Sequence, residues 1–403
     1  MPSSDAYTTY RVSGLPPNVT FDQAKWILEA FFDSDGVATE PKVHSLGLDP
    51  FDFGRNVDMI ATVTFSQTPA EFLEGDCWVR EKVFTNEDDL VSLVLTIDTK
   101  FDGFTPINTV KDDEDHKIDC IVVSGLSSHP FGSWKQRGGH FMWLRDASTW
   151  RSPGVRVLLY GYDTSLVRSE SFQDIDDIGQ KLGDFITAIR HTRTGEINYE
   201  PRPLVFIAHS LGGLVVKEAI CRLAHKDETN ARCVYGLIFF GVPNLGIRTQ
   251  HWLPMVDNQP NMNLVHNLEP GSLYLRSLHD RFCRVFTSPT SRVVSVYETV
   301  KSKTAKWDEG LGRWALNGPT EVLVPRDSAQ GSCPPELNHN HSSLAMNQNH
   351  SDLPKFRGPH DSDYRLLARY LHNLWKNAVV DVQSRFGPEG YFPKGGVKLR
   401  EGK

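Results

Sequence analysis

The chain has 403 residues, of which 39% are hydrophobic and 23% are charged, and its formal net charge is −7. This composition is typical of globular proteins and excludes the disordered, collagen-like and coiled-coil classes. At roughly 150 residues per domain, the length predicts two or three domains, or one large domain with a smaller one. A negative net charge argues against a nucleic-acid-binding protein, which usually presents a basic face.

The charge is unevenly distributed along the chain. Residues 1–98 carry 17 acidic and 6 basic side chains, a net charge of −11, so the remaining residues carry +4. This split predicts a separate acidic N-terminal module. No apolar run approaches the roughly 18 residues that a membrane-spanning helix needs, and the first residues lack the pattern of a signal peptide. The sequence therefore predicts a cytoplasmic protein without a transmembrane segment, with its six scattered cysteines as buried or free thiols.

The N-terminal module, residues 1–98, has a β-α-β-β-α-β pattern, which predicts a ferredoxin-like domain. Two of its strands resemble the sheet motifs of an RNA-recognition module, but Arg11, Ile60 and Thr62 stand where that module has base-stacking aromatics. Together with the acidic charge, this predicts no RNA binding and a module that packs on the rest of the chain or docks a partner. The expected strands are Tyr10–Leu15, Lys42–Leu48, Met59–Phe65 and Val91–Ile97, and the expected helices are Phe21–Phe32 and Ala70–Leu73.

The pattern changes after residue 98. Residues 99–117 contain Gly, Pro and an acidic cluster, and we expect a linker there that partly packs. Residues 118–383 alternate apolar strands with amphipathic helices, which predicts a doubly wound, mostly parallel sheet of the α/β class. We expect a helical cap near 244–290 and a loose tail at 384–403. The expected strands are Ile118–Val123, Val155–Tyr160, Leu204–Ile207, Val234–Phe240, Val293–Tyr297 and Glu321–Val324, and the marked helices are Ser171–Arg190 and Asp361–Asp381.

The sharpest signal in the sequence surrounds Ser210. An apolar strand runs into Ala208-His-Ser-Leu-Gly212 and an apolar helix follows at once. This is the G-x-S-x-G nucleophile elbow with Ala in place of the first Gly. Positions two before and two after the serine must be small, because strand and helix cross closely there. The N–H of Leu211, at the start of the helix, is then placed to bind a developing oxyanion.

A serine nucleophile needs a base that an acid orients. In α/β-hydrolases the chain order is Ser, then acid, then His. Glu298 lies at the end of an expected strand and is the preferred acid, whereas Asp257 and Asp308 do not directly follow a strand. For the base, the spacing leaves four histidines open in the polar loop expected after the last strand. These histidines are His339, His341, His350 and His360.

Several further stretches resemble a fungal group of lipase-like α/β-hydrolase domains, related to serine-active-site-containing and inositol-deacylase-like proteins. Such domains often stand N-terminal to NACHT or NB-ARC/ankyrin receptors. The resemblance implies Glu298 as the acid and His350 as the base of a Ser-His-Glu triad with Ser210. It rests on the elbow and on Phe101-Asp-Gly-Phe-Thr-Pro106, His129-Pro-Phe-Gly-Ser-Trp134, Met142-Trp-Leu-Arg-Asp146, Tyr160-Gly-Tyr-Asp-Thr164, Phe239-Phe-Gly-Val-Pro243, Tyr297-Glu-Thr299 and His350-Ser-Asp-Leu-Pro-Lys-Phe356.

The chain departs from that family in the loop after the first central strand. The family usually reads His-Gly-Leu-Gly-Gly there, whereas this chain reads Ser124-Gly125-Leu126-Ser127-Ser128. The resemblance implies that this loop supplies the second oxyanion N–H, from Leu126. Backbone donors survive side-chain replacement, so the expected site contains Ser210, Glu298 and His350 with the N–H groups of Leu211 and Leu126.

These residues predict a serine hydrolase of the esterase, lipase or thioesterase kind, acting on a small-molecule or lipid-like acyl substrate. No metal and no organic cofactor is implied, and the oligomeric state is left open. Two alternatives belong to other classes. One is a biosynthetic enzyme of secondary metabolism that cyclises or transfers an acyl group on the same fold, and the other is a non-catalytic signalling or docking module.

Overall fold

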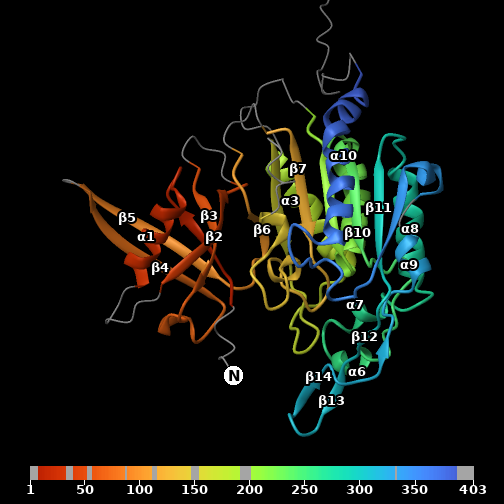
Figure 1. Ribbon diagram of the computed structural model, residues 1–403, viewed down its shortest axis with the longest axis horizontal. Helices are drawn as coiled ribbons and strands as arrows, with labels where there is room; N and C mark the ends of the chain where they lie inside the picture. The colour runs from red at the N-terminus through yellow and green to blue at the C-terminus, as the bar shows by residue number, and fades with distance from the viewer. Residues whose placement is uncertain are drawn as a thin grey trace, which may run out of the picture.

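The computed structural model describes residues 8–32, 40–51, 57–86, 89–110, 116–146, 154–190, 201–331 and 334–387. Within these ranges no helix is long and apolar enough to cross a membrane. In these residues the polypeptide forms two large sheets, each with its own hydrophobic core, and two short two-stranded pairs (Figure 1).

The larger sheet has seven strands in the order β16-β11-β10-β9-β7-β8-β6. Six strands run parallel, and β6 pairs antiparallel with β8 at one edge. Figure 1 shows α10 (Ser362–Ser384) in front of this sheet and α3 (Ile175–Arg190) behind it, so both faces are covered by helices. Strand order, crossover helices and the elbow after β9 together give the α/β-hydrolase fold. The strands are β6 (Gly103–Pro106), β7 (Ile118–Val123), β8 (Val155–Gly161), β9 (Leu204–His209), β10 (Val234–Phe240), β11 (Arg292–Glu298) and β16 (His341–Met346).

Three helices form one layer, because α4 (Leu211–Lys226) packs against both α3 (Ile175–Arg190) and α8 (Leu273–Val285). The last helix, α10 (Ser362–Ser384), contacts β10 through Leu374. Asp174 and Asp177 cap the start of α3 reciprocally, each carboxylate accepting the other residue's N–H. Short helices occupy the connections: α2 (Trp143–Asp146), α5 (Glu228–Cys233), α6 (Leu253–Val256), α7 (Met262–His266) and α9 (Arg326–Gln330).

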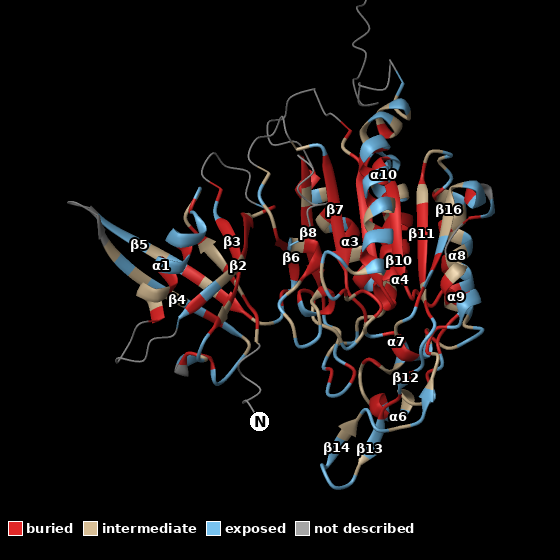
Figure 2. Cartoon of the chain, in the orientation of Figure 1, coloured by how far each residue is buried: buried red, intermediate tan, exposed pale blue. Residues whose placement is uncertain are grey.

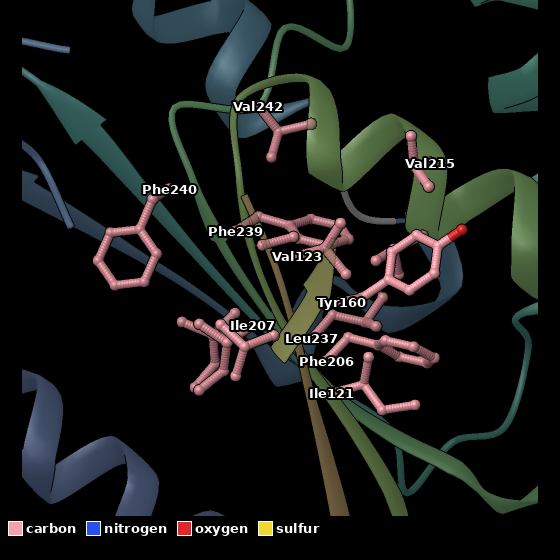
Figure 3. Packing of buried hydrophobic residues seen from close by; sticks show 14 of the residues in the cluster. Ile121, Val123, Tyr160, Phe206, Ile207, Val215, Leu237, Phe239, Phe240 and Val242 are labelled. Carbon is pink, nitrogen blue, oxygen red and sulfur yellow. The ribbon is translucent and has the colours of Figure 1, made fainter. Parts of the chain in front are cut away.

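The central strands are buried on both faces, as Figure 2 shows by the continuous red of β7 and β10. This explains their near-continuous apolar sequences, because a parallel sheet covered on both sides has no solvated face. Figure 3 shows the side chains of neighbouring strands packed together, with Ile121 and Val123 from β7, Phe206 and Ile207 from β9, and Leu237, Phe239 and Phe240 from β10.

The smaller sheet has the order β2-β3-β1-β5-β4 and is antiparallel throughout. Four of its strands match the expected ones, but the expected second helix is only one 3-10 turn, Ala70–Phe72. The chain instead adds a long edge strand that the apolar pattern did not reveal, since both its faces mix apolar and charged residues. The elements are β1 (Tyr10–Leu15), α1 (Phe21–Phe32), β2 (Pro41–Leu48), β3 (Met59–Phe65), β4 (Cys77–Asn86) and β5 (Asp89–Asp98).

The structure extends one expectation about the connections and contradicts another. Part of the expected linker is β6, whose side chains are buried at the edge of the large sheet. The expected strand Glu321–Val324 does not join the large sheet, because Thr320–Glu321 (β15) pairs only with Ser302–Lys303 (β12). The acidic cluster of the linker and most of the expected tail lie outside the described residues.

The expected helical cap near 244–290 divides into two parts. The short helices α6 and α7 lie beyond the carboxyl end of β10, in the lower part of Figure 1. By contrast, α8 belongs to the layer that covers the sheet, since it packs on α4. A second excursion, between β11 and β16, also extends from the carboxyl edge. It contains a hairpin of β13 (Lys306–Asp308) and β14 (Arg313–Ala315).

The open face of the small sheet packs against the edge of the large one. Arg11 donates to the carbonyl oxygen of Asp102 at 2.8 Å, just before β6, and to Asp98 at 2.7 Å. Thr62 is fully buried on this face, and the hydroxyl of Thr109 donates to the carbonyl oxygen of Leu46 at 3.1 Å. The positions at which an RNA-recognition module would stack bases are therefore occupied by contacts within the chain.

His44 lies at this junction and should make it sensitive to acid. Burial and the positive charges of Arg145, Lys135 and Lys42 lower the pKa of His44 from 6.5 to about 3. Between these two values the unfolded chain binds a proton that the folded chain does not. The free energy of unfolding should therefore fall as the pH drops from about 6.5 toward about 3.

His44→Gln tests this acid sensitivity, because glutamine cannot gain a charge and its side-chain amide can replace the hydrogen bond of His44 to Thr64. Urea unfolding at neutral pH and at about pH 4.5 should show a smaller loss of stability for the variant than for the wild type. Equal losses in the two proteins would remove His44 as a source of acid sensitivity.

Candidate active site

Ser210 occupies the turn between β9 and α4 in a conformation that a non-glycine residue rarely adopts, with φ 54° and ψ −126°. Such strain persists only where the surroundings enforce it. Here the N–H of Ser210 donates to the carbonyl oxygen of Phe240 at 2.9 Å, and that of Gly213 donates to the carbonyl oxygen of Ser210 at 3.1 Å. The turn presents the serine hydroxyl beyond the carboxyl end of the sheet, as the elbow motif requires.

The glycine two residues after Ser210 allows α4 to approach β7. A Cβ on Gly212 would lie 2.5 Å from the carbonyl oxygens of Val123 and Ser124, which are backbone atoms that cannot rotate away. Gly212→Ala should therefore reduce the free energy of unfolding by about 1–3 kcal/mol, as overpacking does. The matched control is Gly358→Ala, because a Cβ there meets nothing within 4 Å. Chemical denaturation of both variants measures the difference, and equal stability would contradict the steric account.

The structure brings Ser210, His350 and Glu298 together from three separate segments. Nε2 of His350 lies 2.9 Å from Oγ of Ser210, and Nδ1 of His350 lies 2.6 Å from Oε2 of Glu298. All three residues are buried, with 4–6% of their surface exposed. The distances are within hydrogen-bond reach, so a proton has a continuous path from the serine hydroxyl to the imidazole, whose other nitrogen faces a carboxylate.

Two groups that the sequence analysis missed hold the acid in place. The N–H of Leu323 and that of Val324 both donate to Oε1 of Glu298, at 2.8 and 3.3 Å. Ser302 holds the base, because its Oγ accepts the N–H of His350 at 3.0 Å. No local motif marks these partners, since they come from the excursion after β11 and their roles depend on its path.

The loop that carries His350 is anchored by an aromatic cluster. Nε1 of Trp143 donates to the carbonyl oxygen of Pro354 at 2.9 Å, and its ring lies 5.5 Å from that of Phe356. Leu353 is fully buried beside Gly241, where a larger residue would contact the imidazole of His350. The stretches around Trp143 and around Phe356, which lie far apart in the sequence, therefore form one support for His350.

A second histidine packs beside the first. His209 precedes Ser210, its ring centroid lies 4.8 Å from that of His350, and its Nε2 donates to the carbonyl oxygen of His350 at 3.0 Å. Burial and the neighbouring His350 hold the pKa of His209 well below its ordinary value. A neutral His209 therefore fixes the backbone of His350 without adding a positive charge beside it.

The two expected oxyanion donors lie on either side of Ser210. Leu211 begins α4, and Leu126 follows Gly125, whose backbone lies so close to Ser210 that a Cβ there would be 2.8 Å from the serine Cβ. In the part of the chain that the structure describes, neither N–H donates to a protein acceptor. Leu211 and Leu126 are therefore placed to offer two backbone donors to an oxygen bound at Ser210.

The serines of the loop Ser124–Ser128, where the chain differs from the family pattern, lie in a loop fixed by hydrogen bonds. The N–H of Ser127 donates to the carbonyl oxygen of Thr164 at 2.7 Å, and Ser127 has a φ of 53°, where glycine would be unstrained. Thr164 in turn donates through its hydroxyl to the carbonyl oxygen of Ser128 at 2.7 Å. Ser124 is fully buried, and its carbonyl oxygen accepts the hydroxyl of Tyr162 at 2.8 Å. These bonds fix the loop despite the loss of two glycines.

The other candidates of the sequence analysis lie elsewhere. Asp257 is exposed and accepts a hydrogen bond from the amide of its neighbour Asn258. Asp308 accepts the N–H of Leu311 in the turn of the β13–β14 hairpin. His341 begins β16 and bonds Ser295 at 2.9 Å, while His339 and His360 are exposed. Among the described residues no group of three His, Cys, Asp or Glu side chains is arranged to hold a metal ion.

Comparison with known proteins relates the elbow-bearing segment to serine esterases. Residues 120–278 match the family model described as "Putative serine esterase (DUF676)". The chain is also similar to "Protein SERAC1" of Mus musculus, at 26% identity over 204 residues, and of Homo sapiens, at 25% over 205 residues. These matches cover 45% and 46% of this chain but only 30% of each relative, so the chain spans about a third of their length.

The solved structures that superpose on the chain include lipase BlEst2 of Bacillus licheniformis and a monoacylglycerol lipase of Paleococcus ferrophilus. The first has 15% identity and a TM-score of 0.41, and covers 66% of this chain and 97% of its own. The second has 12% identity and a TM-score of 0.34, with coverages of 64% and 96%. At these scores the assignment of the fold rests on the strand order above. The segment that carries Ser210 is thus similar to a serine esterase domain, and the chain that contains it has the α/β-hydrolase fold.

Proposed function

We propose that the chain is a serine esterase that hydrolyses an acyl ester or thioester through Ser210, His350 and Glu298. The observation that carries the proposal is the unbroken series of contacts from Ser210 through His350 to Glu298, at 2.9 and 2.6 Å. The match to the serine esterase model supports the class of reaction, although it ends at residue 278, before Glu298 and His350.

The mechanism begins with attack by Oγ of Ser210 on the acyl carbonyl carbon, while Nε2 of His350 takes the hydroxyl proton. Glu298 stays ionised and stabilises the imidazolium through Nδ1–H. The N–H groups of Leu211 and Leu126 bind the negative oxygen of the tetrahedral intermediate. The imidazolium then gives its proton to the leaving alcohol or thiol, and an acyl-serine remains.

The second half-reaction repeats these roles with water as the nucleophile. His350 removes a proton from the water as it attacks the acyl-serine, and returns that proton to Oγ of Ser210 when the carboxylic acid leaves. If an alcohol or amine takes the place of water, the same residues transfer the acyl group. Analysis of the product therefore separates hydrolysis from transfer or cyclisation.

A fluorophosphonate probe tests the nucleophile directly, because it forms a covalent adduct only with an activated serine. We expect one adduct on the native protein, located at Ser210 by peptide mass spectrometry. Denatured protein should give none, because the activation depends on the folded arrangement. A native protein that resists the probe, or that is labelled at another serine, would overturn the proposal.

A further inference from the structure

The hairpin of β13 and β14 exposes a concentration of apolar side chains at the carboxyl edge of the large sheet. Trp307 is 48% exposed, Leu311 at the turn 58%, and Leu316 after β14 65%. Single exposed apolar residues are normal on a protein surface, but a cluster within ten residues is a feature that needs an explanation. Figure 1 shows the hairpin as the lowest projection of the molecule, away from the body of the large sheet.

The same projection is basic, although the chain as a whole is acidic. Residues 300–318 contain four basic and two acidic side chains, whereas the formal net charge of the chain is −7. One acid, Asp308, is engaged in the fold of the turn, where it accepts the N–H of Leu311 at 3.0 Å and the amide of Asn317 at 2.9 Å. The exposed basic side chains are Lys301, Lys303, Lys306 and Arg313.

Specific contacts order the hairpin, and its stem is connected to residues that support the candidate active site. Trp307 pairs with Trp314 across the two strands, with ring centroids 5.8 Å apart, and Gly312 supplies the positive φ of the turn. At its base, β12 and β15 pair, with Ser302 opposite Glu321. Ser302 is the residue that holds the backbone of His350, and Leu323, two residues after β15, donates to Glu298. The stem of the hairpin therefore begins at Ser302, which supports His350, and ends near Leu323, which supports Glu298.

We propose that the β13–β14 hairpin docks the protein on an anionic lipid surface, with Trp307 and Leu311 at the level of the headgroups. Tryptophan favours the membrane–water interface because its ring is apolar with one polar N–H. Lysine and arginine nearby are attracted to anionic headgroups. That this surface delivers a lipid-borne ester to Ser210 rests on the proposed function, whereas the docking itself does not.

Flotation with lipid vesicles tests the docking on the full chain. Ser210→Ala protein avoids turnover of the lipid and should float with vesicles of equimolar phosphatidylcholine and phosphatidylserine, and much less with phosphatidylcholine alone. Replacing Trp307 and Leu311 together by Ser should weaken binding to the mixed vesicles at least about tenfold, because their apolar surface no longer leaves water. Replacing Lys306 and Arg313 together by Gln should weaken it about thirtyfold on the mixed vesicles and little on the neutral ones.

Matched controls lie on other exposed surfaces of the described chain. Trp26→Ser with Val380→Ser removes two side chains that are 60% and 70% exposed on α1 and α10. Arg369→Gln with Lys376→Gln removes two exposed positive charges from α10. Thermal unfolding checks that every variant is folded, and we expect both control pairs to bind vesicles as the parent does.

Three outcomes would overturn the proposal. These are no flotation of the parent protein, equal losses in the hairpin and control variants, or a hairpin that proves to be the contact between two copies of the chain. Light scattering detects the last, as a dimer that dissociates when Trp307 and Leu311 are replaced. Labelling of Ser210 by the fluorophosphonate probe reports on the proposed function separately, so failure of one inference is distinguishable from failure of the other.

Discussion

Ser210→Ala is expected to reduce ester turnover by about 10⁶-fold, or to the background rate, while the protein remains folded. The loss is large because no other group at the elbow can form the acyl intermediate. Alanine is smaller than serine and has the same backbone preferences, so it fits the turn at φ 54° as well as serine does. Turnover of a chromogenic acyl ester, measured together with thermal unfolding, gives both quantities for each protein.

A buried serine outside the site is the matched control for this prediction. Ser295 is fully buried in β11, and its hydroxyl bonds His341 at 2.9 Å. Ser295→Ala should leave turnover close to that of the wild type. If Ser210→Ala retained wild-type turnover in the folded state, the covalent mechanism would be wrong.

Glu298→Gln is expected to lower kcat by about 10⁴-fold with the substrate's KM little changed, as for the corresponding acid in other triads. The carboxylate holds the Nδ1–H tautomer of His350 and stabilises the imidazolium. An amide offers no negative charge and can turn its NH₂ group toward the ring, which favours the wrong tautomer. Oε1 of Glu298 also accepts two backbone N–H groups, which an amide oxygen still accepts, so the fold is expected to survive.

Asp257→Asn provides the comparison, because Asp257 was the rival acid in the sequence and is exposed in the structure. Its turnover should equal that of the wild type. A larger loss of turnover for Asp257→Asn than for Glu298→Gln would show that Glu298 is not the acid of the triad. A kcat/KM profile against pH for each variant separates a lost acid from a general loss of stability.

The elbow could be predicted from the sequence because its requirements are local. A strand, a serine, small residues at fixed spacing and a helix occur within a short stretch, and each follows from the sterics of one turn. The position of Glu298 could be predicted almost as directly, since a residue at the end of a parallel strand lies at the same carboxyl edge of the sheet as Ser210. The choice of His350 among four histidines came only from the resemblance, because spacing in a long loop does not determine which side chain returns to the serine.

The excursion after β11 could not be predicted for a physical reason. Its strands are two or three residues long, too short for a pattern of alternating burial. The polar stretch at His341–Met346 hides the last parallel strand, which lies at the sheet edge and therefore has partly exposed side chains. As a result, the expected final strand lies about twenty residues before the observed one, and no pattern marks the supports at Ser302 and Leu323.

The open face of the N-terminal sheet shields the outer edge of the large sheet. If an edge strand such as β6 were uncovered, it could pair with an edge strand of another molecule, which is the first step of aggregation. Here the cover belongs to the same polypeptide, so the shielding is intramolecular and does not depend on protein concentration. The segment that matches the family model, residues 120–278, includes neither β6 nor the small sheet that covers it. The small sheet keeps its own core, yet it supplies the cover for the β6 edge from within the same chain.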